Sequence, residues 1–561
     1  MDVAVIGLLA VLAIASVSAV AARLGVAAPL LLVATGVVVS LLPFVPPVEI
    51  DPEWILMGVL PPLLYSASVS MPAMDFRRDF GTIGSLSVVL VVISSLLVGL
   101  FIAAVVPGVE LATGIALGAI ISPTDAVATS IVKRLGAPSR VVTVLEGESL
   151  LNDATALVLL RSAIAATSVS VSVWGVVGDF VYAVAIAVLV GLLVGRLNLL
   201  VRARVTDPAV NTAISFVVPF AAYLPVEHLG GSGLVAAVAA GLHTGHSAPR
   251  YLEPAHRRAE EQNWRTVELL LEGGVFLLMG LELYGLVEDL DESGGGLGTA
   301  VWVGAVAAAI VVAVRAAYVV PLLVALSRRA GRGEAVRERI AQIQGRIDHP
   351  DFQASERRTE MFRTRLRRGL ADIDYLAGSP VGWREGTVLV WAGMRGVVTL
   401  AAAQTLPADT PERSLLVLVA FVVAAGTLVV QGGTLPLVVR RLGLVSGPEP
   451  DDDRDELIRE LAAAGDRLLR DPALVRPDGT PYDAALLERM QGWAAAQPVA
   501  AAEATPDALD QHRELRIAVL VAMREELLRA RSDGLYSSEA LESALAVLDA
   551  EQISIELRGR R

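Results

Sequence analysis

The sequence has no cysteine and few aromatic residues, and both absences narrow what the protein can do. Without cysteine, its 561 residues form no disulfide, offer no thiol nucleophile and build no cysteine metal site. Aromatics make up 5% of the chain and no basic stretch is interleaved with them, so nucleic-acid binding is not indicated. Charged residues are also scarce at 19%, whereas 54% are hydrophobic and the mean hydropathy is +0.60. This composition is typical of a polytopic membrane protein.

Apolar runs long enough to cross a membrane with some tilt recur along the chain. They predict an all-α polytopic membrane protein with about 13 transmembrane helices. The expected spans are 3–22, 29–45, 53–70, 84–107, 111–133, 141–166, 172–200, 210–226, 231–246, 267–287, 299–326, 384–405 and 414–442.

The loops between these spans alternate between basic and acidic or neutral. Because cytoplasmic loops carry the excess of lysine and arginine, the pattern fixes the orientation. Residues 327–380 hold 12 arginines, which places this insertion and the C-terminal tail, 446–561, in the cytoplasm and the N-terminus outside. The tail is acidic and mostly helical in pattern, with helices expected at 456–470 and 515–528. The predicted location is the cell membrane, as a multi-pass protein.

Four carboxylates lie inside otherwise apolar spans, in Ser122-Pro-Thr-Asp125 and in Glu146-Gly-Glu148-Ser149-Leu-Leu-Asn152-Asp153. An ionisable residue at the centre of a spanning helix costs about 2.5–3.5 kcal/mol, so such a group indicates ion or proton handling. Pro123 should also interrupt its helix in mid-membrane. Unwound backbone at that depth is tolerated against protein or a water-filled cavity, where it can ligate a cation. Asp125 can serve there as an ion ligand, as a cap of the broken helix, or as both.

Helical phase separates the polar residues of the sixth span. Ser149 and Asp153 are four residues apart and share one face, while Glu148 and Asn152 share the neighbouring face. Oxygen ligands suit small hard cations, and a carboxylate removed from water also holds a proton more tightly. Asp153 is therefore predicted to exchange a proton for a cation. Asn152 is counted with Asp153 among the ion- or proton-binding residues, and its uncharged amide favours one proton for one monovalent cation, which would be electroneutral.

Two arginines lie deep in the last apolar runs, Arg315 and Arg395. Glu148 is the expected partner of Arg395 in a structural ion pair, because removing one member of a buried pair leaves a charge unbalanced. Arg315 is a further intramembrane charge. Glu146 is expected in the vestibule on the cytoplasmic side.

These residues resemble the monovalent cation:proton antiporters, in the Asn-Asp branch that includes bacterial sodium/proton antiporters and sodium/proton exchangers. The resemblance covers about 440 residues. Its anchors are Leu60-Pro-Pro-Leu-Leu-Tyr65, Ser122-Pro-Thr-Asp-Ala126, Glu146-Gly-Glu-Ser-Leu-Leu-Asn-Asp153, Gly231-Ser-Gly-Leu-Val235, Arg315-Ala-Ala-Tyr318 and Gly393-Met-Arg-Gly396.

The resemblance implies that Asp153 is the essential carboxylate, with Thr124, Asp125 and Ser149 beside it as sodium ligands. It also implies an antiporter domain over 1–445, with a core of 84–166 and 299–442 and a dimer scaffold of 1–74 and 172–288. The core would consist of inverted repeats with two interrupted crossing helices, the fifth and the twelfth. Ser66 and Ala126 depart from many relatives, which have an acidic residue and a proline at these positions.

The expected function is secondary antiport of sodium for protons by alternating access in a homodimer surrounded by lipid. Such a protein is not an enzyme and needs no cofactor. Lithium is a possible second substrate, and a potassium/proton antiporter is the main alternative. A cation channel is more remote, because channels build rings of repeated polar residues, whereas here unlike charges gather at one site. A proton-coupled symporter is disfavoured, because no aromatic or amide-rich pocket accompanies the acids.

Overall fold

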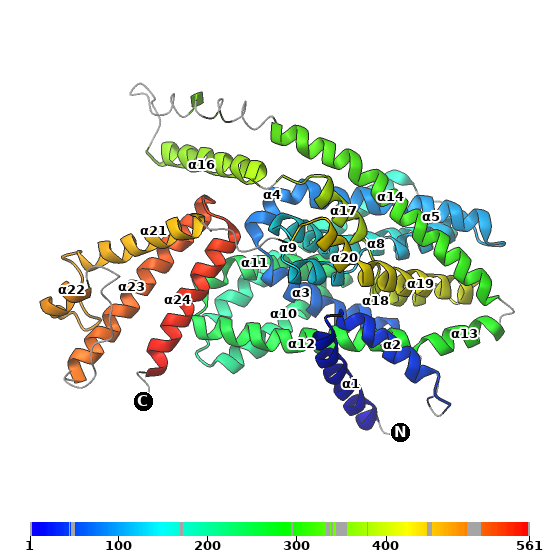
Figure 1. Ribbon diagram of the computed structural model, residues 1–561, viewed down its shortest axis with the longest axis horizontal. Helices are drawn as coiled ribbons and strands as arrows, with labels where there is room; N and C mark the ends of the chain where they lie inside the picture. The colour runs from blue at the N-terminus through cyan, green and yellow to red at the C-terminus, as the bar shows by residue number, and fades with distance from the viewer. Residues whose placement is uncertain are drawn as a thin grey trace. The chain divides into compact units, whose positions relative to one another are not determined.

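The computed structural model describes residues 3–43, 51–168, 172–292, 296–331, 356–378, 380–445, 452–490 and 506–558, and the single positions 45, 337, 340, 342 and 343. Within these ranges every regular element is a helix and no strand forms (Figure 1). The chain divides into two compact units. The first comprises Met1–Leu252, Arg258–Arg328 and Val381–Gly447, and the second comprises Glu253–Arg257, Arg329–Pro380 and Pro448–Arg561. Their further division into core and scaffold stays a prediction.

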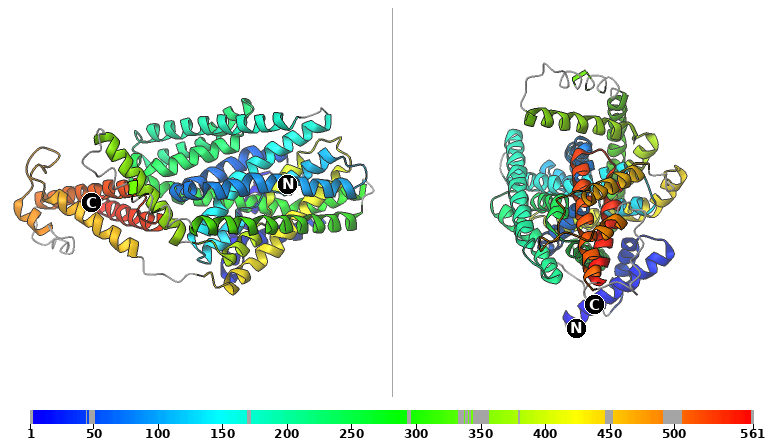
Figure 2. Two further views of the ribbon diagram at one scale, coloured as in Figure 1. Left: turned by 90° about the horizontal axis from the view of Figure 1, so that it is seen from above. Right: turned by 90° about the vertical axis from the view of Figure 1, so that its left-hand side faces the viewer.

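The first unit holds the apolar helices, several of which run alongside one another in the left view of Figure 2. They are α1 (Val3–Leu24), α2 (Ala28–Ser40), η1 (Trp54–Val59), α3 (Leu60–Ser70), α4 (Ala73–Gly84), η2 (Ser85–Leu90), α5 (Val91–Val105), α6 (Leu111–Ile121), α7 (Val127–Arg134), α8 (Ser139–Ser168), α9 (Val173–Arg202), α10 (Pro208–His228), α11 (Gly233–Tyr251), α12 (Pro254–Leu281), α13 (Leu283–Glu292), α14 (Leu297–Gly331), α17 (Trp383–Trp391), α18 (Val397–Gln404), α19 (Arg413–Thr427), η3 (Leu428–Gly432) and α20 (Gly433–Arg441). The three η segments are single π-helical turns within longer helices.

Each predicted span coincides with a helix or with a helix that is interrupted once. Among the described residues, 8 helical stretches are long and apolar enough to cross a membrane, and the count of thirteen crossings stays a prediction. Two stretches are longer than predicted, because helix continues from the fourth span back to Ala73 and from the tenth back to Pro254. Ion pairs bury two of the charges in these extensions: Asp79 accepts from Arg140 at 2.9 Å, and Glu260 accepts from Arg202 at 2.6 Å.

Helix breaks occur at both predicted positions. The α6 helix ends at Ile121, before Pro123, and α7 begins at Val127, while the second break separates α17 from α18. The two breaks touch, because the Asp125 amide donates to the Met394 carbonyl at 2.9 Å. Four helix ends therefore meet in the interior of the first unit, where unpaired backbone groups and partial charges are concentrated.

Close helix packing holds the breaks in place. The α6 helix lies between α5 and α8, and α18 packs against α19 and α6. Gly118 of α6 permits this approach, since a Cβ there would stand 2.2 Å from the Ser95 carbonyl oxygen of α5. The α11 helix packs against α9, α3 and α10, and it also contacts α8. The polar chain breaks are thus enclosed by apolar helices.

The second unit contains the described helices of the insertion and the tail: α16 (Glu356–Gly378), α21 (Asp452–Leu469), α22 (Ala484–Met490), α23 (Pro506–Asp533) and α24 (Ser538–Arg558). The α21 helix packs against α23 and α24 around a small apolar core that includes Leu457, Leu515 and Leu541. The predicted tail helices 456–470 and 515–528 fall within the regions of α21 and α23. Most of 332–355 lies outside the described residues.

Candidate ion-binding site

A cavity of about 240 Å³ reaches the carboxylates that the sequence singles out. Asp125, Thr124, Ser149 and Asp153 all line it. Its walls come from the α6–α7 break, from α8, from α3, from α12 and from the start of α18. Glu146 also lines the cavity, so it extends from the helix breaks toward the side of the basic loops, which is predicted to be cytoplasmic.

The Asp153 carboxylate is nearly buried at the wall of the cavity. Asp153 lies on α8, and 7% of its surface is exposed. Ser149, one turn earlier on the same helix, is also 7% exposed. Among the described residues, no hydrogen bond or ion pair involves the Asp153 side chain, and Asp125 is close enough to repel it when both are ionised. A carboxylate in this setting requires a positive charge or a proton. Helical phase correctly places Ser149 and Asp153 together on the cavity side of α8.

Glu148 and Asn152, on the neighbouring face, are not among the residues that line the cavity. The Asn152 amide donates to the Thr124 hydroxyl at 2.8 Å and to the Thr124 carbonyl at 3.3 Å. The Thr124 hydroxyl in turn donates to Glu148 Oε1 at 3.3 Å. Asn152 therefore orients a cavity-lining residue and fixes the unwound segment to α8.

Asp125 lies where two half-helices begin. Its Oδ1 accepts from the Val127 amide at 2.8 Å, at the start of α7. Its other oxygen lies against Gly396, the residue before α18, where a Cβ would come within 1.2 Å of Oδ2. Because helix N-termini carry partial positive charge, they stabilise an anion between them. Asp125 is thus held by the backbone, and Gly396 is the residue that leaves room for it.

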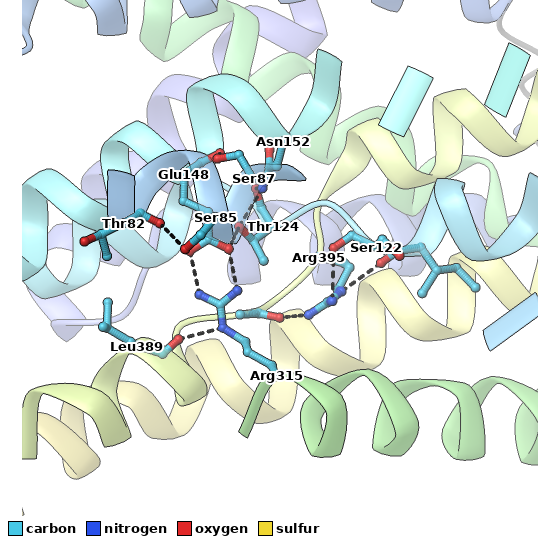
Figure 3. Close-up of polar contacts among 12 residues, drawn as sticks. Thr82, Ser85, Ser87, Ser122, Thr124, Glu148, Asn152, Arg315, Leu389 and Arg395 are labelled. Carbon is cyan, nitrogen blue, oxygen red and sulfur yellow. Dashed lines mark hydrogen bonds and ion pairs between the residues drawn. The ribbon is translucent and has the colours of Figure 1, made fainter. Parts of the chain in front are cut away.

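The predicted ion pair between Glu148 and Arg395 is wrong, because the arginine that pairs with Glu148 is Arg315. Arg315, on α14, donates from Nη2 to Glu148 Oε2 at 2.7 Å and from Nη1 to Oε1, and both side chains are 2% exposed (Figure 3). Its Nε donates to the Leu389 carbonyl at 2.7 Å. Arg315 therefore joins α14, α8 and α17 through one guanidinium group, in the two-pronged geometry that suits a carboxylate.

Among the described residues, the Arg395 side chain donates hydrogen bonds to carbonyl groups at helix ends and not to a carboxylate. Its Nε donates to the Ile121 carbonyl at 2.8 Å, its Nη2 to the Ser122 carbonyl at 3.2 Å, and its Nη1 to the Gly393 carbonyl (Figure 3). These carbonyls stand at the C-terminal ends of α6 and α17, which carry partial negative charge. Sequence alone gives the depth of each arginine, and only the crossing of the helices shows which groups it meets.

Two cavity residues escape the sequence analysis, Glu268 and Glu272 of α12. They are four residues apart and so share one face of the helix. Their spacing inside the tenth predicted span is the signal that could have found them. Glu146 also lines the cavity and accepts from Lys133 Nζ at 3.1 Å. Carboxylates thus border the cavity between the helix breaks and the predicted cytoplasmic side.

Residues 7–441 match the transmembrane family of sodium/hydrogen exchangers. The chain belongs to this family. It is therefore a member of a family of transporters and not of enzymes. The sodium/hydrogen exchanger match includes both helix breaks, α8, Arg315 and Arg395.

Individual relatives agree with the family assignment. An uncharacterised Na⁺/H⁺ exchanger of Mycobacterium tuberculosis is 30% identical over 99% of this chain and 97% of its own length. The Na⁺/H⁺ antiporter ApNhaP of Aphanothece halophytica is 26% identical over 74% of this chain and 70% of its own. Among solved structures, the sodium proton antiporter MjNhaP1 of Methanocaldococcus jannaschii matches with a TM-score of 0.56 at 16% identity, covering 80% of this chain and 100% of that one. This last likeness shows the fold.

Proposed function

We propose that the chain is a sodium/proton antiporter in which one proton and one sodium ion compete for the Asp153 carboxylate. The observation that carries the proposal is the state of this residue: 7% exposed, bordering a cavity, and without a hydrogen bond or ion pair among the described residues. Ser149 and Thr124 supply hydroxyl oxygens at the same cavity, and Asp125 supplies a second carboxylate. Oxygen ligands of this kind suit a small hard cation.

The charges around the helix breaks support a one-for-one exchange. Three carboxylates, those of Asp125, Glu148 and Asp153, lie at or beside the helix breaks, as do the guanidinium groups of Arg315 and Arg395. When all are ionised, the group carries one negative charge in excess. One proton or one monovalent cation restores neutrality, and each would do so without the other. Electroneutral exchange follows. Sodium is the expected cation, because the chain belongs to the family of sodium/hydrogen exchangers.

Transport would proceed by alternating access in the cell membrane, with the N-terminus outside and the tail in the cytoplasm. The predicted core carries the helix breaks and α8, and it would move against the predicted scaffold. The scaffold would also form a homodimer, and lipid would cover the remaining apolar surface. Much of α1 and α9 is exposed in the single chain, including Leu8, Leu12, Leu189 and Leu193, and this surface is available for either contact.

Reconstituted transport tests the proposal. Purified protein in liposomes should acidify or alkalinise the lumen when a sodium gradient is imposed, and lithium and potassium gradients applied in turn define the cation range. Asp153→Asn should abolish the exchange while the protein stays folded. Asp179→Asn on α9 removes an exposed aspartate far from the cavity in sequence and serves as the matched control. Absence of cation-driven proton movement in the unmodified protein would refute antiport, and full activity of Asp153→Asn would remove Asp153 from it.

A further inference from the structure

A second cavity begins one turn beyond Asp153 on α8. It measures about 350 Å³ and is lined by Leu157, Arg161, Glu53, Tyr223 and Glu227, among others. Leu157 and Arg161 follow Asp153 by four and eight residues, which corresponds to about 6 and 12 Å along the helix. The cavity at Asp153 extends toward the basic loops, so this one lies toward the opposite, predicted outer side. The two cavities together flank the exchanging carboxylate.

An apolar cluster separates the two cavities. Leu60, Leu64 and Leu150 line the first, Tyr223 and Leu234 line the second, and all five belong to one packed group of buried residues. Leu157 and Val398 pack against this group. Its members come from helices on both sides of the predicted boundary between core and scaffold. A hydrophobic layer of this kind stops an ion, so an ion in the second cavity would have to cross this cluster to reach Asp153.

One ion pair crosses the same boundary on the predicted outer side. Arg161 Nη2 of α8 donates to Glu227 Oε2 of α10 at 2.8 Å. The other oxygen, Glu227 Oε1, accepts from the Gly233 amide at the start of α11 at 3.0 Å. Glu227 is therefore held by α10 and α11, whereas Arg161 belongs to the helix that carries Asp153. Movement of α8 away from these two helices must break the pair.

We propose that the second cavity is the outer half of the ion path and that the Arg161–Glu227 pair is a latch that keeps this cavity separated from Asp153. The inference rests on the proposed antiport, because it assigns the residues that hold one of its two conformations. When the latch opens, Glu227 and Glu53 are left in the cavity wall, where their negative charge would attract a cation. With the latch made, Asp153 communicates with the predicted cytoplasmic cavity alone.

Removing the latch should therefore populate the outward-open conformation. Arg161 is 57% exposed and Glu227 22%. An ion pair with this exposure changes an equilibrium by about 1.4- to 5-fold. Either Arg161→Gln or Glu227→Gln should shift the equilibrium toward the outward-open conformation. The reversed pair, Arg161→Glu with Glu227→Arg, should undo much of this shift. Arg204→Gln is the matched control, because Arg204 donates to the Leu200 carbonyl and touches no carboxylate at this boundary.

The chain has no cysteine, so single cysteines report accessibility without background. Leu157→Cys places a thiol in the second cavity and Ser70→Cys places one in the first. A membrane-impermeant thiol reagent, applied to each side in turn, should label them from opposite sides. Labelling at Leu157→Cys should become about 1.4- to 5-fold faster in both single-charge variants and should return toward the original rate in the reversed pair. Equal rates in every background would overturn the latch.

A cross-link supplies a second, independent test. In Arg161→Cys with Glu227→Cys, a reducible bifunctional thiol reagent should abolish exchange, and reduction should restore it. Exchange that persists through complete cross-linking would refute the proposal, because the closed latch could not then be part of the cycle. The labelling readout does not depend on transport. Failure of antiport itself would appear as absent exchange in the unmodified protein, whereas failure of the latch alone would leave that exchange intact.

Discussion

The buried pair of Glu148 and Arg315 offers a quantitative test of how the charges are divided. Replacing Arg315 with methionine keeps much of the side-chain volume and leaves the Glu148 side chain, 2% exposed, without its cation. Breaking a buried pair in this way destabilises a protein by about 3–5 kcal/mol. With an unfolding entropy of about 2.1 cal/mol/K per residue over roughly 400 residues of the first unit, Tm should fall by about 4–6 °C.

A double-mutant cycle then identifies the partner of Glu148. Glu148→Gln combined with Arg315→Met should lower Tm by clearly less than the two single changes added together, because the second change removes a charge already left unpaired. Glu148→Gln combined with Arg395→Met should be close to additive, since Arg395 donates to three carbonyls. Thermal unfolding of the purified full chain in detergent measures all five variants. Coupling to Arg395 and additivity with Arg315 would refute the assignment.

Three further results are expected. Gly396→Ala should impair exchange strongly, because its Cβ would collide with the Asp125 carboxylate, whereas Gly426→Ala, with nothing within 4 Å of the added Cβ, should leave transport near the original rate. Glu268→Gln with Glu272→Gln should raise KM for sodium more than it lowers the maximal rate, because these carboxylates border the path and do not bind the exchanged ion; a change in maximal rate alone would contradict this. Sodium-driven proton movement should be insensitive to membrane potential when the proton gradient is clamped, and a clear dependence would exclude one-for-one exchange.

Local rules account for much of the site. Pro123 lacks an amide hydrogen, so the helix break next to Asp125 follows from the sequence alone. The four-residue spacing of Ser149 and Asp153 likewise places both on the cavity side of α8, since helical phase does not depend on neighbouring elements. The same phase turns Glu148 and Asn152 away from the cavity.

The partners of these residues depend on how distant helices cross, which the sequence pattern does not contain. Arg315 and Arg395 both lie deep in apolar runs. Only the approach of α14 to α8 shows that Arg315 is the one that pairs with Glu148. Glu272 is a similar case, because a carboxylate near the start of a predicted span is expected at a membrane surface. The structure shows it at the same cavity as Asp153.

Competition between a proton and sodium at Asp153 is the central claim, and sodium–sodium exchange in liposomes tests it most directly. Isotopic sodium influx should be measured at equal pH on both sides, over a series of pH values. The account predicts that the apparent KM for sodium rises as pH falls, approaching about tenfold per pH unit at the acidic end, while the maximal rate stays constant. A KM that does not change with pH, with acid lowering the maximal rate alone, would contradict the competition.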